Sequence, residues 1–208
     1  MSRFIYLHGF ASGPSSKKAA FFRERFRELG MGLDTPDLAE GRFEQLTISG
    51  QLAVIERTAQ GDPVSLIGSS MGGYLAALYA ARHPEVEKLV LLAPAFSFLT
   101  RWPEGLGESK MEEWKRTGVM QVFDYVEKRE VAIGYQLIED AQKYEGFPEF
   151  PQPVLIFHGK HDATVPPEHS VTFSEQHPQT TLRLMESDHQ LLNVLDDIWM
   201  ETEKFLFG

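Results

Sequence analysis

The sequence contains no cysteine, so several kinds of chemistry are excluded from the start. A chain without thiols forms no disulfide bond, offers no thiolate nucleophile and binds no metal through sulfur. The redox state of its compartment is left open by the same absence. There is also no internal repeat, low-complexity segment or linker, and we therefore expect a single core.

Long hydrophobic runs are missing as well. No segment stays apolar and free of charge over the roughly 20 residues that a membrane-spanning helix needs. The N-terminal stretch MSRFIYLHGF has one arginine before a short apolar run and no small-residue cleavage site, which is unlike a signal peptide. We expect a cytoplasmic protein that does not insert into a membrane.

Basic residues are scarce relative to acidic ones. The chain has 20 Lys and Arg against 30 Asp and Glu, which gives a formal net charge of −10. Such a surface repels the phosphates of nucleic acids and the headgroups of anionic lipids, so we expect no nucleic-acid partner. We attribute the charge to solubility rather than to attraction of cationic substrates.

The sequence does contain an alternation of short β-forming runs and longer helical patterns, over 208 residues of which 42% are hydrophobic. This alternation is typical of βα units around a mostly parallel sheet in one domain. The predicted strands span residues 4–7, 33–35, 64–67, 88–92, 154–158 and 181–185. The predicted helices span residues 16–29, 43–59, 71–82, 135–144, 168–176 and 190–207.

One region interrupts this alternation. Between Pro94 and Pro153 the chain takes about sixty residues to pass from one predicted strand to the next, far more than a plain βα connection needs. The region carries Trp102 and Trp114, two of the three tryptophans. We expect residues of about 95–150 to form a cap over the ends of the strands.

The strongest local motif is Gly68-Ser69-Ser70-Met71-Gly72-Gly73, between a predicted buried strand and a predicted helix. Only Ser70 has glycine at both the second position before it and the second position after it. A serine that projects from a sharp strand-to-helix turn needs small neighbours, because the backbone is strained and other chain segments approach closely. Ser70 is therefore the candidate nucleophile, although the motif would also suit a glycine-rich turn of purely structural use.

A serine hydroxyl needs a base within hydrogen-bond reach, and that base needs a third group to orient it. In folds with this strand-to-helix turn the acid and then the histidine follow the serine along the chain. His189 comes directly after the last predicted strand and is the candidate base, while His169 and His177 are expected at the surface. Asp162 follows the strand 154–158 and is the candidate acid, ahead of Asp188.

Two further features complete the expected site. The oxyanion of a tetrahedral intermediate needs two backbone N–H donors, which we assign to Met71, directly after the nucleophile, and to Phe10 in the loop that follows the first strand. His8 is expected to brace that loop. The run His158 to Asp162 also contains residue types that bind zinc, but no second cluster completes a ligand set, so we expect no metal.

Taken together, the motifs LHGFASG, GSSMGGYLA, LLAP, HGKHDATVP and SDHQL resemble the α/β-hydrolase superfamily over nearly the whole chain. More narrowly, HGFASGPSSKKA with GSSMGGY is similar to the small bacterial esterases of the YqiA type. The resemblance implies a three-layer α/β-hydrolase fold in one domain, residues 1–208, with a reduced, mostly parallel sheet and a cap insertion. It also implies a Ser70, Asp162, His189 triad, an oxyanion hole at Phe10 and Met71, and no cofactor.

We therefore expect a serine esterase that hydrolyses small-molecule carboxylic esters or acyl thioesters through an acyl-enzyme intermediate. The aromatic cap suggests an apolar acyl chain of short to medium length. An acyl-CoA thioesterase is an alternative, because Lys17 and Lys18 follow the oxyanion loop and could meet the phosphates of coenzyme A. The pattern is also compatible with a serine peptidase or with a non-catalytic binding protein on the same fold, and the oligomeric state is left open.

Overall fold

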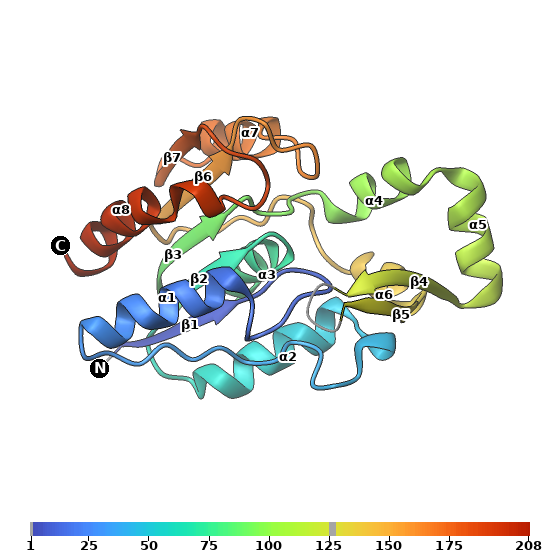
Figure 1. Ribbon diagram of the computed structural model, residues 1–208, viewed down its shortest axis with the longest axis horizontal. Helices are drawn as coiled ribbons and strands as arrows, with labels where there is room; N and C mark the ends of the chain where they lie inside the picture. The colour runs from blue at the N-terminus through green and yellow to red at the C-terminus, as the bar shows by residue number, and fades with distance from the viewer. Residues whose placement is uncertain (1, 125–127) are drawn as a thin grey trace.

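A computed structural model of the protein describes residues 2–124 and 128–208 (Figure 1). Its centre is a five-stranded sheet with the strand order β1-β2-β3-β6-β7, in which neighbouring strands run parallel. The strands are β1 (Arg3–Leu7), β2 (Val64–Ser69), β3 (Val86–Leu92), β6 (Val154–Gly159) and β7 (Thr180–Met185). The expected α/β class with a reduced parallel sheet is confirmed.

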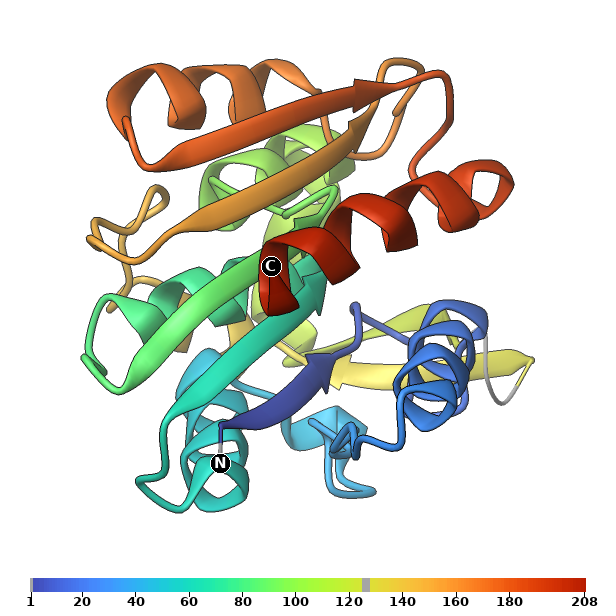
Figure 2. The ribbon, with the colours of Figure 1, turned by 90° about the vertical axis from the view of Figure 1, so that its left-hand side faces the viewer.

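Helices cover both faces of this sheet and make three layers. Helices α1 (Lys17–Glu28) and α8 (Leu195–Phe207) lie on one face, and α8 crosses the sheet in front of the strands in Figure 2. Helices α2 (Ile48–Ala59), α3 (Met71–Ala80) and α7 (Glu168–Gln176) lie on the other face. None of the helices in residues 2–124 and 128–208 combines the length and apolar character needed to span a bilayer.

The alternation of side chains along the strands explains the layers. In β1, Ile5 packs into the core on the α2 and α3 side, whereas Phe4 and Tyr6 pack into the core on the α1 and α8 side. Every residue of β2 is buried, as expected for an inner parallel strand that is covered on both faces. Helix α1 begins where the Ser16 hydroxyl accepts the N–H of Ala19, at 3.3 Å.

The segment between β3 and β6, residues 94–153, is called the insertion below. Its elements are α4 (Phe98–Leu106), α5 (Glu108–Thr117), the antiparallel pair β4 (Val119–Asp124) and β5 (Arg129–Gly134), and α6 (Gln136–Ala141). Helices α4 and α5 and the β4–β5 hairpin extend away from the main sheet (Figure 1). Neither the hairpin nor these two helices are predicted from the sequence, and residues 125–127 of the expected cap lie outside the described residues.

Three predicted elements differ from the structure. Residues 33–35 form a single bridge, between Asp34 and Ile5, because Pro36 has no N–H with which to continue the pairing. The predicted helix 43–59 divides into a short 3₁₀ turn (Phe43–Gln45) and α2, since Thr47 caps a new helix by accepting the N–H of Gly50. Residues 190–194 are likewise not α-helical, and α8 begins only at Leu195.

Candidate active site

Ser70 occupies a strained turn between β2 and α3. Its φ of 54° and ψ of −117° lie where a residue with a Cβ is rarely found. The turn closes tightly because a Cβ on Gly68 would lie 2.4 Å from the carbonyl oxygen of Gly72, and a Cβ on Gly72 would lie 2.1 Å from that of Leu7. The two glycines that mark the motif are therefore required by close backbone approach.

Ser70, His189 and Asp162 are brought together at the carboxyl ends of three strands. The Nε2 atom of His189 lies 3.1 Å from the Oγ of Ser70, and its Nδ1 lies 2.6 Å from the Oδ2 of Asp162. The His189 side chain is 14% exposed, while that of Asp162 is fully buried. The three residues thus form a continuous hydrogen-bonded chain from a buried carboxylate to a hydroxyl that solvent reaches.

Asp162 is held by four hydrogen bonds. Its Oδ1 accepts the backbone N–H groups of Thr164 and Val165, at 2.8 and 2.7 Å, and its Oδ2 accepts from both His158 and His189. Burial alone would raise the pKa of this carboxyl, but the bonds from His158 and His189 and from the Val165 N–H outweigh it. They keep the pKa well below its usual range. Asp162 is therefore an ionised acceptor for the Nδ1–H of His189.

His158 is a member of this cluster that is not predicted from the sequence. It is fully buried on β6, and its Nε2 lies 3.1 Å from the Oδ2 of Asp162 and 2.9 Å from the carbonyl oxygen of Val165. Both partners only accept, so the proton is on Nε2, and Nδ1 accepts the hydroxyl of Ser170 at 2.7 Å. The signal in the sequence is the His-x-x-x-Asp spacing, which by itself suggests only a metal motif.

The loop after β1 lies directly against Ser70. A Cβ on Gly9 would lie 3.4 Å from the Cβ of Ser70, and Phe10 follows it. His8 is buried and accepts the N–H of Leu38 through Nε2, at 3.2 Å, which ties the base of this loop to the chain before α2. Met71 is also buried and is the first residue of α3, so its N–H has no acceptor within the helix.

Aromatic rings extend from the loop after β1 into the insertion. The ring of Phe10 contacts that of Trp102 on α4, with centroids 4.8 Å apart, and Trp102 in turn contacts Phe98 and Trp114. The indole N–H of Trp114 donates to the carbonyl oxygen of Ile133 on β5, at 3.0 Å. The insertion is thereby packed against the loop that carries one of the two expected oxyanion donors.

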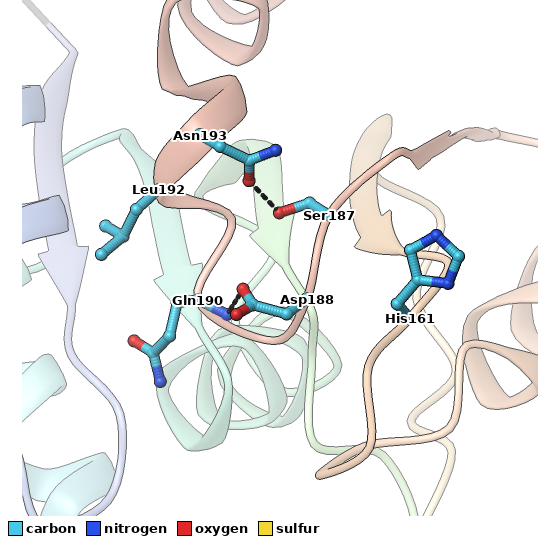
Figure 3. A pocket seen from close by; sticks show the side chains of 6 residues that line it. All are labelled: His161, Ser187, Asp188, Gln190, Leu192 and Asn193. Carbon is cyan, nitrogen blue, oxygen red and sulfur yellow. Dashed lines mark hydrogen bonds between the residues drawn. The ribbon is translucent and has the colours of Figure 1, made fainter.

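A cavity of about 450 Å³ lies beside the loop that carries His189. Figure 3 shows its lining residues: His161, Ser187, Asp188, Gln190, Leu192 and Asn193. Ser70 is not among them, so this hollow belongs to the outer side of the loop. The carboxylate of Asp188 accepts the N–H of Gln190 within the same loop, at 2.9 Å, instead of contacting His189.

One group of side chains in the described part of the chain could hold a metal ion: Glu56, His83 and Glu85. It lies near the start of β3, at the opposite end of the sheet from Ser70. The Nδ1 of His83 is 2.9 Å from a carboxylate oxygen of Glu85, and its ring stacks on Tyr79. His161 is exposed and contacts Glu186, so it does not join His158 and Asp162 in a ligand set.

One expected surface residue is in fact buried. His177 stacks on Phe173, with ring centroids 3.8 Å apart, and lies at hydrogen-bond distance from the carbonyl oxygen of that residue. The prediction was wrong because the Gln-His-Pro-Gln sequence is polar, whereas α7 and Phe150 supply an aromatic wall for the ring.

Comparisons with known proteins agree with this fold. The family described as "Uncharacterised protein family (UPF0227)" matches residues 3–205. A comparison with curated protein sequences gives no match. Among solved structures, a protein from Agrobacterium vitis S4, whose assignment as a hydrolase is an inference, is 26% identical with a TM-score of 0.82. The alignment covers 98% of this chain and 87% of that one.

Two other solved structures are similar over almost the full chain. Alpha/beta hydrolase domain-containing protein 10 from mouse is 21% identical with a TM-score of 0.79, over 97% of this chain and 88% of that one. Est1E from Butyrivibrio proteoclasticus, solved with ferulic acid bound, is 21% identical with a TM-score of 0.79, over 99% and 88%. These likenesses show the α/β-hydrolase fold.

Proposed function

The chain belongs to the UPF0227 family, and from that premise we propose that it is a serine hydrolase of carboxylic esters or acyl thioesters. The observation that carries the proposal is the 3.1 Å contact between His189 Nε2 and Ser70 Oγ, at a serine in a strained turn. A hydroxyl that projects from a strained backbone and faces an oriented imidazole is placed for nucleophilic attack.

In the proposed reaction, His189 Nε2 takes the proton of Ser70 as Oγ attacks the carbonyl carbon of the substrate. The carbonyl oxygen becomes an oxyanion, which the N–H groups of Phe10 and Met71 hold. His189 then gives its proton to the departing alcohol or thiol as the bond to it breaks. Water, deprotonated by His189, attacks the acyl-enzyme, and Ser70 regains its proton when the acid leaves.

Asp162 supports this cycle by orienting the imidazole. Because its carboxylate accepts the Nδ1–H of His189, the lone pair of the imidazole lies on Nε2 and faces Ser70. The same carboxylate stabilises the imidazolium that forms when the proton moves. His158 and the two backbone N–H groups keep the carboxylate in place.

We further propose that the insertion acts as a cap and sets the acyl preference. The ring of Trp102 contacts that of Phe10 and packs on the buried ring of Phe98. Phe10 and Trp102 are only partly buried, and their rings offer apolar surface to an acyl chain of short to medium length. A series of p-nitrophenyl esters from acetate to dodecanoate tests this point. Equal kcat/KM for acetate and for longer acyl groups would contradict it.

The reaction itself is tested with p-nitrophenyl butyrate. We expect the wild type to release p-nitrophenol and S70A to release it at no more than about 10⁻³ of that rate, as for removal of a triad member. S174A is the matched control, because the Ser174 hydroxyl donates within α7, to the carbonyl oxygen of Val171, and it should keep full activity. A wild type without turnover, or an active S70A, would contradict the proposal.

A further inference from the structure

One positive charge near the site has no partner in the described part of the chain. The half-buried lysine and arginine side chains among the described residues are Arg3, Lys18, Arg25, Lys88 and Arg101. Arg3 and Arg25 form ion pairs with carboxylates. The ammonium group of Lys18 forms no hydrogen bond or ion pair with any residue in 2–124 and 128–208. The side chain of its neighbour Lys17 is exposed to solvent.

The other two half-buried cations are satisfied by backbone. The ammonium of Lys88 donates to the carbonyl oxygens of Phe205 and Leu206 at the end of α8, at 2.7 and 3.2 Å. The guanidinium of Arg101 on α4 donates to the carbonyl oxygen of Thr164, two residues after Asp162. The side chain of Lys18 is half-buried as well but makes no such bond, so its ammonium group is free to bind an anion that the protein itself does not supply.

The position of Lys18 on α1 and the charges that act on it place it near the candidate triad. It is the second residue of α1, which follows the oxyanion loop directly, and it is within electrostatic reach of both Asp162 and Asp188. The negative charge of Asp162 also acts on the guanidinium group of Arg101, which lies in the insertion. Two half-buried cations thus lie near the acid of the candidate triad, although the protein as a whole is strongly acidic.

Neither nearby carboxylate needs Lys18 as a structural partner. Asp162 already accepts four hydrogen bonds, which occupy the acceptor sites of its two oxygens. Asp188 uses its carboxylate to accept the N–H of Gln190. A lysine that served only to pair either group would form an ion pair with it, and Lys18 forms one with neither.

We propose that Lys18 binds an anionic group, a carboxylate or a phosphate, carried by the ester or thioester substrate. This inference rests on the proposed function and names the class of its substrate. The anion sits either on the acyl chain or on the leaving group, and both sources present oxygen acceptors to the same ammonium.

The charge of Lys18 also provides a pH signature. Burial lowers the pKa of its ammonium to about 8, while Asp162 and Asp188 act in the opposite direction. The preference for an anionic substrate is therefore present below pH 8 and lost as the ammonium deprotonates above it. An arginine at position 18 would keep its charge through this range, so K18R separates the effect of charge from the effect of pH on the rest of the site.

The experiment compares matched substrates that differ in charge. p-Nitrophenyl hydrogen adipate against p-nitrophenyl hexanoate tests an anion on the acyl side. Butyryl-CoA against butyryl-N-acetylcysteamine tests an anion on the leaving-group side. The variants are K18M, K18R and, as the matched control that removes an equal charge from solvent, K17M.

For at least one pair we expect the wild type to favour the anionic substrate. K18M should lower kcat/KM for that substrate by about 10- to 100-fold through a raised KM, because a charge-assisted hydrogen bond is lost. The neutral substrate and the K17M variant should be unaffected. In the wild type the preference should fall with a midpoint near pH 8, and in K18R it should persist to higher pH.

Three outcomes overturn the inference. They are the absence of an anionic preference in both pairs, an equal loss for anionic and neutral substrates in K18M, and an equal effect of K17M and K18M. If the wild type cleaves the neutral esters in these cases, the proposed function stands and only the role of Lys18 fails. If no ester or thioester is cleaved, both fail together.

Discussion

Replacing Lys18 with methionine is expected to make the protein more stable. Burial lowers the pKa of its ammonium from the ordinary 10.5 to about 8, so folding disfavours the charged form. Each unit of difference between the pKa of the folded and of the unfolded chain corresponds to about 1.4 kcal/mol. The full cost of the charged Lys18 to the free energy of folding is therefore about 3 kcal/mol. Because the side chain is only half-buried, solvent screens part of this cost, and we expect K18M to gain about 1–3 kcal/mol at pH 7. Methionine keeps the length and flexibility of the side chain without its charge.

The pH dependence of this gain follows from the direction of the pKa change. Below pH 8 the ammonium is protonated in both the folded and the unfolded chain, so the wild type bears the whole cost. Between pH 8 and pH 10.5 the folded chain releases the proton while the unfolded chain keeps it, and the stability of the wild type rises toward that of K18M. The difference between the two proteins should therefore be large at pH 7 and small near pH 10.

Urea unfolding followed by tryptophan fluorescence measures the difference. At pH 7, K18M should have a higher midpoint with an unchanged slope, or a melting temperature higher by about 2–4 °C for each kcal/mol. K17M should match the wild type, since Lys17 is exposed. A K18M protein that is less stable at pH 7, or a gain of the same size at pH 7 and pH 10, would show that burial does not disfavour the charged form of Lys18.

Other variants test the candidate triad and its turn. D162N should lower kcat by up to about 10⁴-fold, whereas D188N should lower it less than tenfold; the reverse order would move the acid to Asp188. Because the pKa of Asp162 is held low, its carboxylate contributes stability that is lost as the pH falls below about 4, and D162N should flatten this acid loss in thermal melts. G72A should unfold or destabilise the protein by at least about 3 kcal/mol, since its Cβ would lie 2.1 Å from the carbonyl oxygen of Leu7. G32A, with open space around it, is the control and should change stability by less than about 1 kcal/mol in the same urea titration.

Much of the fold could be predicted because local and global signals agree. The strand 154–158 is a continuous apolar run, and the structure extends it by one residue at its end. The structure of the insertion is harder to predict, because its elements are held in place by contacts with residues that are distant in the sequence. The buried carboxylate of Asp140 accepts the backbone N–H and the hydroxyl of Ser49, which lies 91 residues away. No local pattern reports such a contact.

The residues of the candidate site also differ in whether the sequence alone predicts them. Ser70 is marked by its glycines, and these are required by backbone contacts within a few residues and by the end of β1. The fourth group of the cluster was missed because the role of His158 depends on Val165 and Ser170, which only the folded loop brings to its two ring nitrogens. Lys17 and Lys18 are equivalent in sequence, yet one side chain is exposed and the other lies within the field of the acidic side chains of the site.

The most direct test of Ser70 as the nucleophile is covalent labelling of the intact protein with a fluorophosphonate probe, followed by peptide mass spectrometry. We predict one adduct, on the peptide that contains Ser70, with no adduct in S70A and slower labelling in D162N. Labelling should also be suppressed by a competing ester substrate. A folded wild type that takes up no probe, or an adduct that persists on another residue in S70A, would contradict the assignment.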